Sequence, residues 1–177
     1  MSNRIYASAQ ASSTAGQNNK IMAGRESYYA IGKIIRSIYL YQFSSFLFTN
    51  ATATSSQGPS LNNVQTSYLN SIGGDIWTQN TNYLNTSSGI QLWTVPATGI
   101  YQIIAAGASG GSSISNNSTS GKTFLGGKGI IVSTTLSLTA GQVLKILVGQ
   151  KGLTGGIDQR AGGGGGASFV VLTDKQG

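Results

Sequence analysis

Few side chains in this sequence could carry out chemistry. Its 177 residues include no histidine, no cysteine and only four acidic residues, at positions 26, 75, 158 and 174. Without histidine or cysteine the chain cannot build a Ser-His-Asp or Cys-His catalytic centre, a zinc site made of these residues, or a disulfide. The acids are spread along the chain, which argues against a paired-carboxylate hydrolase. The composition therefore predicts a protein that is not an enzyme and uses no metal or cofactor.

Two features imitate binding sites. Gly121, Lys122 and Thr123 match the end of a phosphate-binding loop, but Asn116 stands where that motif needs its first glycine. Trp77 and Trp93, together with the tyrosines, could line a sugar-binding face. We favour the alternative, in which Trp93 belongs to the core and Trp77 anchors a loop.

The net charge of +7 is concentrated at the start of the chain, because five of the 11 basic residues lie within the first 36 positions. This density is modest for a nucleic-acid interface, and an acidic protein neighbour fits it equally well. Residues 28–48 are apolar and about long enough to cross a bilayer. Lys33 and Arg36 lie near the middle of that stretch, where each would cost a few kcal/mol. Burial against protein is therefore favoured over a membrane span, and nucleic acid is not an expected partner.

Residues 1–43 are predicted to form an N-terminal arm that anchors the protein to a partner. Residues 1–23 are polar and have no periodic apolar face. A helical spacing of isoleucines predicts an amphipathic helix over residues 25–42, although Gly32 and the β-forming side chains leave a strand open. The helix could instead pack on its own β domain. The expected partner-binding residues of the arm are Arg25, Tyr28, Ile31, Ile34, Ile35 and Ile38.

Residues 44–177 are predicted to form an all-β domain. The clearest strands are IQLWTV (90–95), GIYQIIAAGA (99–108), GIIVSTTLSL (129–138), QVLKILVGQ (142–150) and ASFVVL (167–172). Short strands separated by turn sequences are typical of a sandwich or jelly roll. FLFT (46–49) is a further candidate strand, and residues 61–69 have the spacing of a short helical turn. Because Tyr101 and Ile103 alternate with Ile100 and Ile104, the strand at 99–108 is expected to be buried on both faces.

Glycine is concentrated in the second half of the chain, where 18 of the 26 glycines lie at or after position 107. A run of five glycines could be a flexible linker. It could also be backbone packed so closely that no Cβ fits, as in bundled chains of the polyproline-II type. The flanking strands favour the second interpretation. The expected structural glycines are Gly107, Gly110, Gly111, Gly126, Gly127, Gly129, Gly162, Gly163, Gly164, Gly165 and Gly166.

Three blocks in order carry a resemblance to a known family: GIQLWTVPATGIYQIIAAGASGG, GGKGIIVSTTLSLTAGQVLKILVGQKG and AGGGGGASFVV. They resemble the glycine-rich domain in the extracellular part of the anaplastic lymphoma kinase and leukocyte tyrosine kinase receptors. The resemblance covers residues 89–172 and implies a tumour-necrosis-factor-like (TNF-like) β-sandwich with inserted polyglycine-II helices. It also implies a further strand and another glycine run after Leu172. This sequence lacks the receptors' cysteines and kinase, so their cytokine-binding role does not carry over.

The preceding block, FLFTNATATSSQGPSLNNVQTSYLN with IWTQNTNYLN, resembles a lead-in to the same domain in structural proteins of phages and large DNA viruses. This resemblance implies a virion component assembled in the host cytoplasm, with other capsid proteins as partners. We therefore expect a minor capsid or capsid-associated protein that packs against neighbouring subunits through its arm. The alternative is a fibre or tail adhesin that recognises host surface glycans, and a homo-oligomer is compatible with either role.

Overall fold

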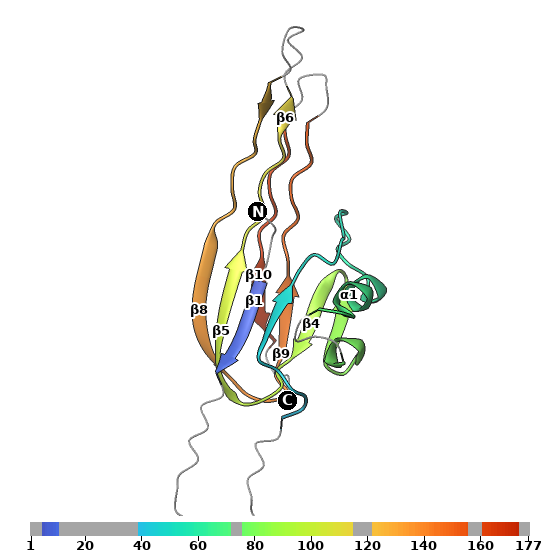
Figure 1. The fold of residues 1–177 in the computed structure, drawn as a ribbon, viewed down its shortest axis with the longest axis vertical. Coiled ribbons are helices and arrows are strands. Elements are labelled where there is room, and N and C mark those ends of the chain that lie inside the picture. The colour runs from blue at the N-terminus through green and yellow to red at the C-terminus, as the bar shows by residue number, and fades with distance from the viewer. Residues whose placement is uncertain (1–4, 11–38, 72–75, 115–121, 156–160, 174–177) are drawn as a thin grey trace, which may run out of the picture.

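The computed structural model describes residues 5–10, 39–71, 76–114, 122–155 and 161–173, with backbone alone for residues 5–10. The described chain is all-β apart from short helical segments. One antiparallel sheet has the strand order β2 (Ser45–Phe48), β1 (Ile5–Gln10), β5 (Gly99–Ala106), β8 (Ile131–Leu138). The other has the order β10 (Phe169–Leu172), β9 (Val143–Leu147), β4 (Ile90–Thr94), β3 (Leu84–Ser87). We call them sheet A and sheet B (Figure 1).

The strands predicted from their residue pattern are present. In β4 the side chains of Gln91 and Trp93 are buried while their neighbours are partly exposed, which is the period-two pattern of a strand with one covered face. A tight turn joins β8 to β9, and Gly141 in it has a φ of 82°, a conformation that favours glycine. The expected strand at 46–49 is β2.

The helical turn expected at residues 61–69 is α1 (Leu61–Tyr68). Its start is set by a capping box: the Ser60 Oγ accepts a hydrogen bond from the Asn63 backbone N–H at 3.2 Å, and the Asn63 Oδ1 accepts one from the Ser60 N–H at 3.1 Å. Val64 and Tyr68 point into the protein. A 3₁₀ helix, η2 (Trp77–Gln79), packs beside α1 and β3.

The core lies between the sheets and beneath α1, and it is built largely from aromatic rings. Trp93 is fully buried and lies 5.7 Å from Phe48 and 5.9 Å from Tyr101, ring centroid to centroid. Trp77 is also buried, and its ring stacks on Tyr41 at 5.0 Å. Trp93 is thus a core residue as expected, and Trp77 packs with it in one cluster.

Strand β5 is not buried on both faces, contrary to expectation. Tyr101 and Ile103 face the core, but 54% of the Ile100 surface is exposed and Gln102 is exposed as well. Sheet A therefore has one covered face and one open face, as antiparallel sheets commonly do. An apolar side chain on the second face of a strand does not by itself require a covering layer.

The domain boundary expected at residue 44 is wrong. Strand β1, within the predicted arm, lies between β2 and β5 in sheet A, with Ile5 opposite both Phe48 and Ala105. Tyr41 and Phe43 pack against the aromatic core. Residues 39–42, the end of the predicted helix, are not helical. The rest of that helix lies outside the described residues, as do Arg25, Tyr28, Ile31, Ile34, Ile35 and Ile38.

Candidate functional site: a glycine bundle and the surfaces around it

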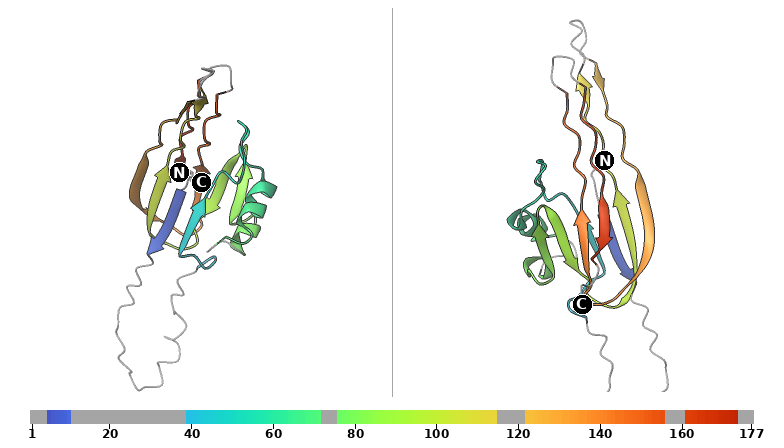
Figure 2. Two further views of the ribbon diagram at one scale, coloured as in Figure 1. Left: turned by 45° about the horizontal axis from the view of Figure 1, so that its top comes forward. Right: turned by 180° about the vertical axis from the view of Figure 1, so that it is seen from behind.

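Four glycine-rich segments extend together beyond one end of the sheets, as Figures 1 and 2 show. We call them the glycine bundle, and they comprise residues 107–112, 126–130, 149–155 and 162–166. Each follows a strand of the sandwich or leads into one: 107–112 follows β5, 126–130 precedes β8, 149–155 follows β9 and 162–166 precedes β10. The sandwich therefore sets where the four segments start. At its far end the bundle carries a two-stranded ribbon of β6 (Ser113–Ile114) and β7 (Thr123–Phe124).

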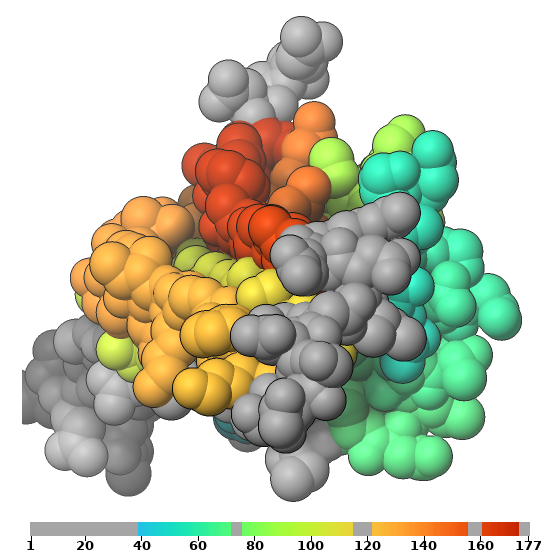
Figure 3. Space-filling model, turned by 90° about the horizontal axis from the view of Figure 1, so that it is seen from above, coloured from blue at the N-terminus to red at the C-terminus, as the bar shows by residue number. Residues whose placement is uncertain are grey.

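Segment 107–112 is at the centre of the bundle, because it forms backbone hydrogen bonds with all three other segments. The Gly110 N–H donates to the Gly127 carbonyl at 2.9 Å, and the Gly111 N–H donates to the Gly163 carbonyl at 2.8 Å. The Ser109 carbonyl accepts from the Gly152 N–H at 3.0 Å. Figure 3, which looks onto this end of the molecule, shows the corresponding yellow, orange and red segments lying against one another.

These hydrogen bonds recur with a period of three residues. Segment 107–112 donates to segment 162–166 from residues 108 and 111, and it accepts from segment 149–155 at residues 109 and 112. Segment 162–166 donates to segment 149–155 from residues 163 and 166. Each face of segment 107–112 thus meets one neighbouring segment, in contrast to the two-residue alternation of a β-strand.

At many positions the bundle leaves no room for a side chain. A Cβ added to Gly165 would lie 2.2 Å from the Ala108 carbonyl oxygen, and one added to Gly162 would lie 2.1 Å from the Gly111 oxygen. Real Cβ atoms essentially never come within 3.0 Å of such an atom. We call a glycine closed where an added Cβ would meet backbone in this way. Gly126 and Gly129 are closed by the carbonyl oxygens of Gly110 and Gly107. The expected contact between the five-glycine run and residues 107–111 is present.

The expected glycines are not equivalent. An added Cβ would meet nothing within 4 Å at Gly127 or Gly164, and it would make only ordinary contacts at Gly107. Conversely, Gly149 and Gly152 are closed by the carbonyl oxygens of Gly166 and Gly163 at 2.2 and 2.1 Å, and sequence reasoning missed both. The signal that could have found them is their spacing of three, which the pairs 126/129 and 162/165 share.

A groove of about 600 Å³ opens beside the base of the bundle. One wall is the loop at residues 54–59 with Ser88 and Gly89, and the other consists of residues 147–153 with Phe169. A hydrogen bond of 2.8 Å from the Gln150 side chain to the Ser55 carbonyl joins the two walls. The lining combines hydrogen-bonding groups of serine, glutamine and glycine backbone with apolar side chains, and Lys151 adds one positive charge.

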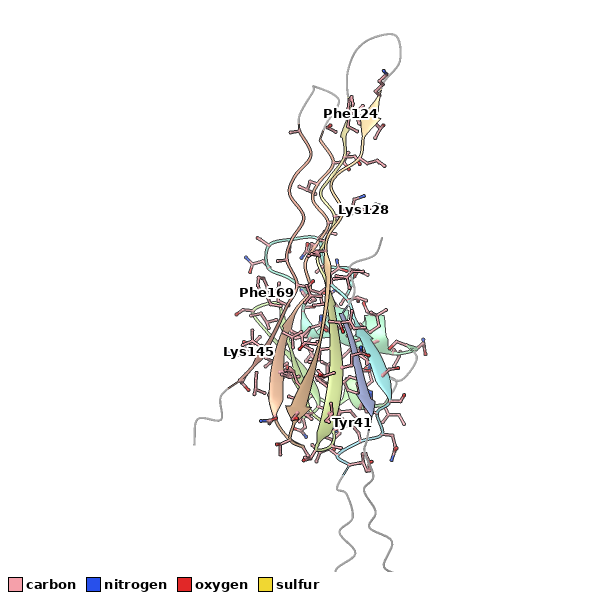
Figure 4. All side chains as sticks on the ribbon, turned by 90° about the vertical axis from the view of Figure 1, so that its left-hand side faces the viewer. Tyr41, Phe124, Lys128, Lys145 and Phe169 are labelled. Carbon is pink, nitrogen blue, oxygen red and sulfur yellow. The ribbon has the colours of Figure 1, made fainter. Side chains whose placement is uncertain are left out.

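The described surface carries little charge. It includes four lysines, Lys122, Lys128, Lys145 and Lys151, all exposed, and no acidic residue. Figure 4 shows Lys128 beside the bundle and Lys145 on the outer side of sheet B, far apart from each other. Lys128 and Lys145 therefore do not belong to one basic patch.

Large apolar side chains are exposed on both sheets. On sheet B, Phe169 and Val171 of β10 are 57% and 53% exposed. On sheet A, Ile131 and Val132 of β8 are 62% and 57% exposed. Exposed apolar surface spread over several strands is typical of a protein that contacts other proteins.

The aromatic residues do not form a sugar-binding face, because Trp77 and Trp93 are 4% and 0% exposed. Burial also raises the pKa of the Tyr41 and Tyr68 hydroxyls above the ordinary tyrosine range. The Tyr41 hydroxyl donates a hydrogen bond to the Thr94 carbonyl, and the Tyr68 hydroxyl donates to the Gln91 Oε1 at 2.9 Å. These tyrosines therefore stabilise the core as neutral hydrogen-bond donors.

Within the described ranges, no three histidine, cysteine or acidic residues come together in a way that could hold a metal ion. In the same ranges, no helix has the length and apolar character needed to cross a membrane. A search against protein-family models finds none that matches the chain.

Proposed function

We propose that this chain is a structural protein of a virus particle, a minor capsid or capsid-associated component, and that it works by contact and not by catalysis. The observation that carries the proposal is the apolar, nearly charge-free surface of the two sheets, with Ile131, Val132 and Phe169 each more than half exposed. A surface of this kind gains free energy when another protein covers it. The viral setting rests on the resemblance of residues 46–85 to structural proteins of phages and large DNA viruses.

The proposal includes a more specific architecture, a TNF-like jelly roll with polyglycine-II insertions. The three-residue period of the bundle's hydrogen bonds supports it, because a polyproline-II-type helix has three residues per turn. The positions of Gly162 and Gly165 support it as well, since neither leaves room for a Cβ where segment 162–166 meets residues 108–111. In this role the bundle is a stiff spacer that holds the distal ribbon away from the sandwich.

Contact with neighbouring capsid subunits is assigned to the N-terminal segment between β1 and β2, which carries the isoleucine stripe. The test is to change Ile31, Ile34, Ile35 and Ile38 together to serine in the full chain and to assemble particles from the source virus with this variant. The matched control changes Ser12, Ser13 and Ser37 to alanine in the same segment. We expect the isoleucine variant to stay folded, by circular dichroism, and to be lost from purified particles, whereas the control is incorporated normally. Normal incorporation of the isoleucine variant would contradict the assignment.

The groove at the base of the bundle favours a second candidate function, an adhesin that binds host glycans. Hydroxyl-rich ligands suit a groove that offers many hydrogen-bonding groups and an exposed aromatic ring, here Phe169. The test is binding of the full chain to a glycan array. Gln57→Ala and Phe169→Ala should abolish binding, and Phe124→Ala, which changes an equally exposed ring far from the groove, should not. An array without a single bound glycan would rule out this second candidate and leave the structural role unaffected.

A further inference from the structure

One edge of sheet A differs from the other edges of the two sheets. Strands β2, β3 and β10, which form the other three edges, have four residues each, whereas β8 has eight. Among the described residues β8 pairs with β5 alone. Its free side therefore presents a long row of backbone donors and acceptors. Proteins usually protect such an edge by shortening it or by placing charge, proline or a bulge in it.

Strand β8 has none of these protections. Its sequence, IVSTTLSL, contains no charged residue, proline or glycine, and it pairs with β5 residue for residue over its whole length, without a bulge. Seven of its eight residues are exposed. Sheet B differs in this respect, because Lys145 lies directly opposite the exposed Val171 and places a charge beside the apolar side chains of β10.

The inner face of β8 is also incompletely covered. Leu136 and Val132 lie opposite Tyr101 and Ala105, on the side of sheet A that faces the core. Leu138, at the end of the strand, is buried, but Leu136 is 37% and Val132 is 57% exposed. Sheet B thus leaves apolar side chains open along the same edge that has free backbone groups.

We propose that β8 pairs with β8 of a second copy of this chain, antiparallel and about a two-fold axis through Thr134, so that the two A sheets become one continuous sheet. In this register Val132 of each copy lies opposite Leu136 of the other, and Thr134 lies opposite Thr134. Apolar pairs and threonine pairs in these positions stabilise antiparallel strands. The numbers of two paired residues always differ by an even amount, so a residue on the inner face of one copy meets a residue on the inner face of the other. Both inner faces therefore lie on the same side of the joined sheet.

The charges allow this arrangement. Lys128 is the described lysine nearest to β8, three residues before its start. Because the two strands run in opposite directions, the two Lys128 side chains lie at opposite ends of the joined edge. The two glycine bundles likewise extend in opposite directions and do not collide. The inference depends on the geometry of sheet A alone and stands or falls separately from the viral role.

The first test is the mass of the full chain in solution, measured by sedimentation velocity over a range of concentrations. We expect a species of twice the 18.2 kDa of the chain. Thr134→Lys places two like charges opposite each other on the axis and should convert the dimer to monomer. Gln102→Lys is the matched control, because it adds the same charge at an exposed position on β5, one strand inside the edge, and should leave the dimer intact. Circular dichroism checks that both variants fold.

The second test uses the absence of cysteine from the chain. Residues directly opposite in antiparallel strands have Cα atoms about 4.5–5.5 Å apart, within the range that a disulfide bridges. Thr134→Cys should therefore give a covalent dimer on oxidation or with a short bis-maleimide. Ser137→Cys should not, because the two copies of residue 137 would lie about 20 Å apart along the strands.

A chain that is monomeric at every concentration overturns the proposal, and so does a dimer that links through residue 137 and not through residue 134. A monomer that binds a synthetic peptide of residues 28–38, and loses this binding in Thr134→Lys, also overturns the proposal. That result would assign the β8 edge to residues 28–38.

Discussion

The sandwich and the glycine bundle are packed by opposite means. In the sandwich, large rings fill the space between backbones, and nine aromatic residues from Tyr41 to Tyr101 form one contact network. In the bundle the backbones touch each other, and the Gly129 Cα hydrogen occupies the place where a Cβ would lie 2.0 Å from the Gly107 oxygen. The sandwich is sensitive to a loss of side-chain volume, and the bundle is sensitive to a gain at the glycines where an added Cβ would meet backbone.

The difference shows what each region depends on. Burial of apolar area stabilises the sandwich. The bundle buries little side-chain area and depends on backbone hydrogen bonds between segments, which are geometrically demanding and contribute only about 1 kcal/mol each. The bundle also begins from strand ends that the sandwich holds in place, so its stability depends on the sandwich.

The largest effect should come from emptying the sandwich core. Trp93→Ala removes a fully buried ring and should lower the free energy of unfolding by about 3–5 kcal/mol. Urea denaturation followed by fluorescence or circular dichroism measures the loss. Phe124→Ala, which removes a ring that is 57% exposed beyond the bundle, should change the free energy by no more than about 0.5 kcal/mol. Equal effects of the two variants would show that the aromatic network is not the main source of stability.

Neighbouring glycines should respond to alanine with opposite signs. Gly165→Ala forces a methyl group against the Ala108 carbonyl and should destabilise the protein by about 2–3 kcal/mol. At Gly164 an added Cβ meets open space, so Gly164→Ala should be neutral or stabilising by up to about 1 kcal/mol, because it restricts the unfolded chain. This corrects the expectation that Gly164, at the centre of the run, is a tightly packed position.

Thermal melting of the two variants measures the contrast. If both melt like the parent protein, residues 162–166 act as a linker and the backbone contacts carry no stability.

A smaller effect should come from the buried hydrogen bonds that join α1 to the sheets. The Tyr68 hydroxyl accepts from the Thr49 N–H at 2.7 Å and donates to Gln91. Tyr68→Phe leaves these groups without a partner in the core and should cost about 1–2 kcal/mol. Tyr39→Phe is the control, since Tyr39 is 44% exposed and loss of its hydroxyl should change the stability little. Chemical denaturation should therefore separate the two variants, and identical midpoints would contradict the role given to the Tyr68 hydroxyl.

The effect that is smallest near neutral pH comes from the buried tyrosines, which lower the stability of the sandwich only in alkali. Burial raises the pKa of Tyr41, Tyr68 and Tyr101 in the folded state, whereas unfolded tyrosines ionise near about pH 10. Above that pH the unfolded chain releases protons that the folded chain retains, so stability falls as pH rises. The bundle contains no tyrosine. Denaturation midpoints measured from pH 8 to pH 11 should fall above about pH 10, and fall less steeply in Tyr41→Phe; a flat profile would contradict the prediction.

Local pattern predicted much of the sandwich. Strands β4, β5, β8, β9 and β10 all lie within segments recognised from alternating or β-branched residues, and α1 lies where helical spacing indicated a turn. The placement of Trp93 in the core followed from its size and its strand. These features depend on neighbours two to four residues away, which the sequence displays directly.

Only the tertiary structure decided the rest. The sequence of β1, IYASAQ, has only a weak strand pattern of its own. It forms a strand because it pairs with β2 on one side and β5 on the other, which lie about 40 and 90 residues further along the chain. Local pattern also could not show that sheet B leaves β8 uncovered. Glycine content predicted that backbones meet in the bundle. Which glycines are closed, Gly165 and not Gly164, depends on where a second and a third segment lie, because a Cβ clashes with atoms distant in sequence.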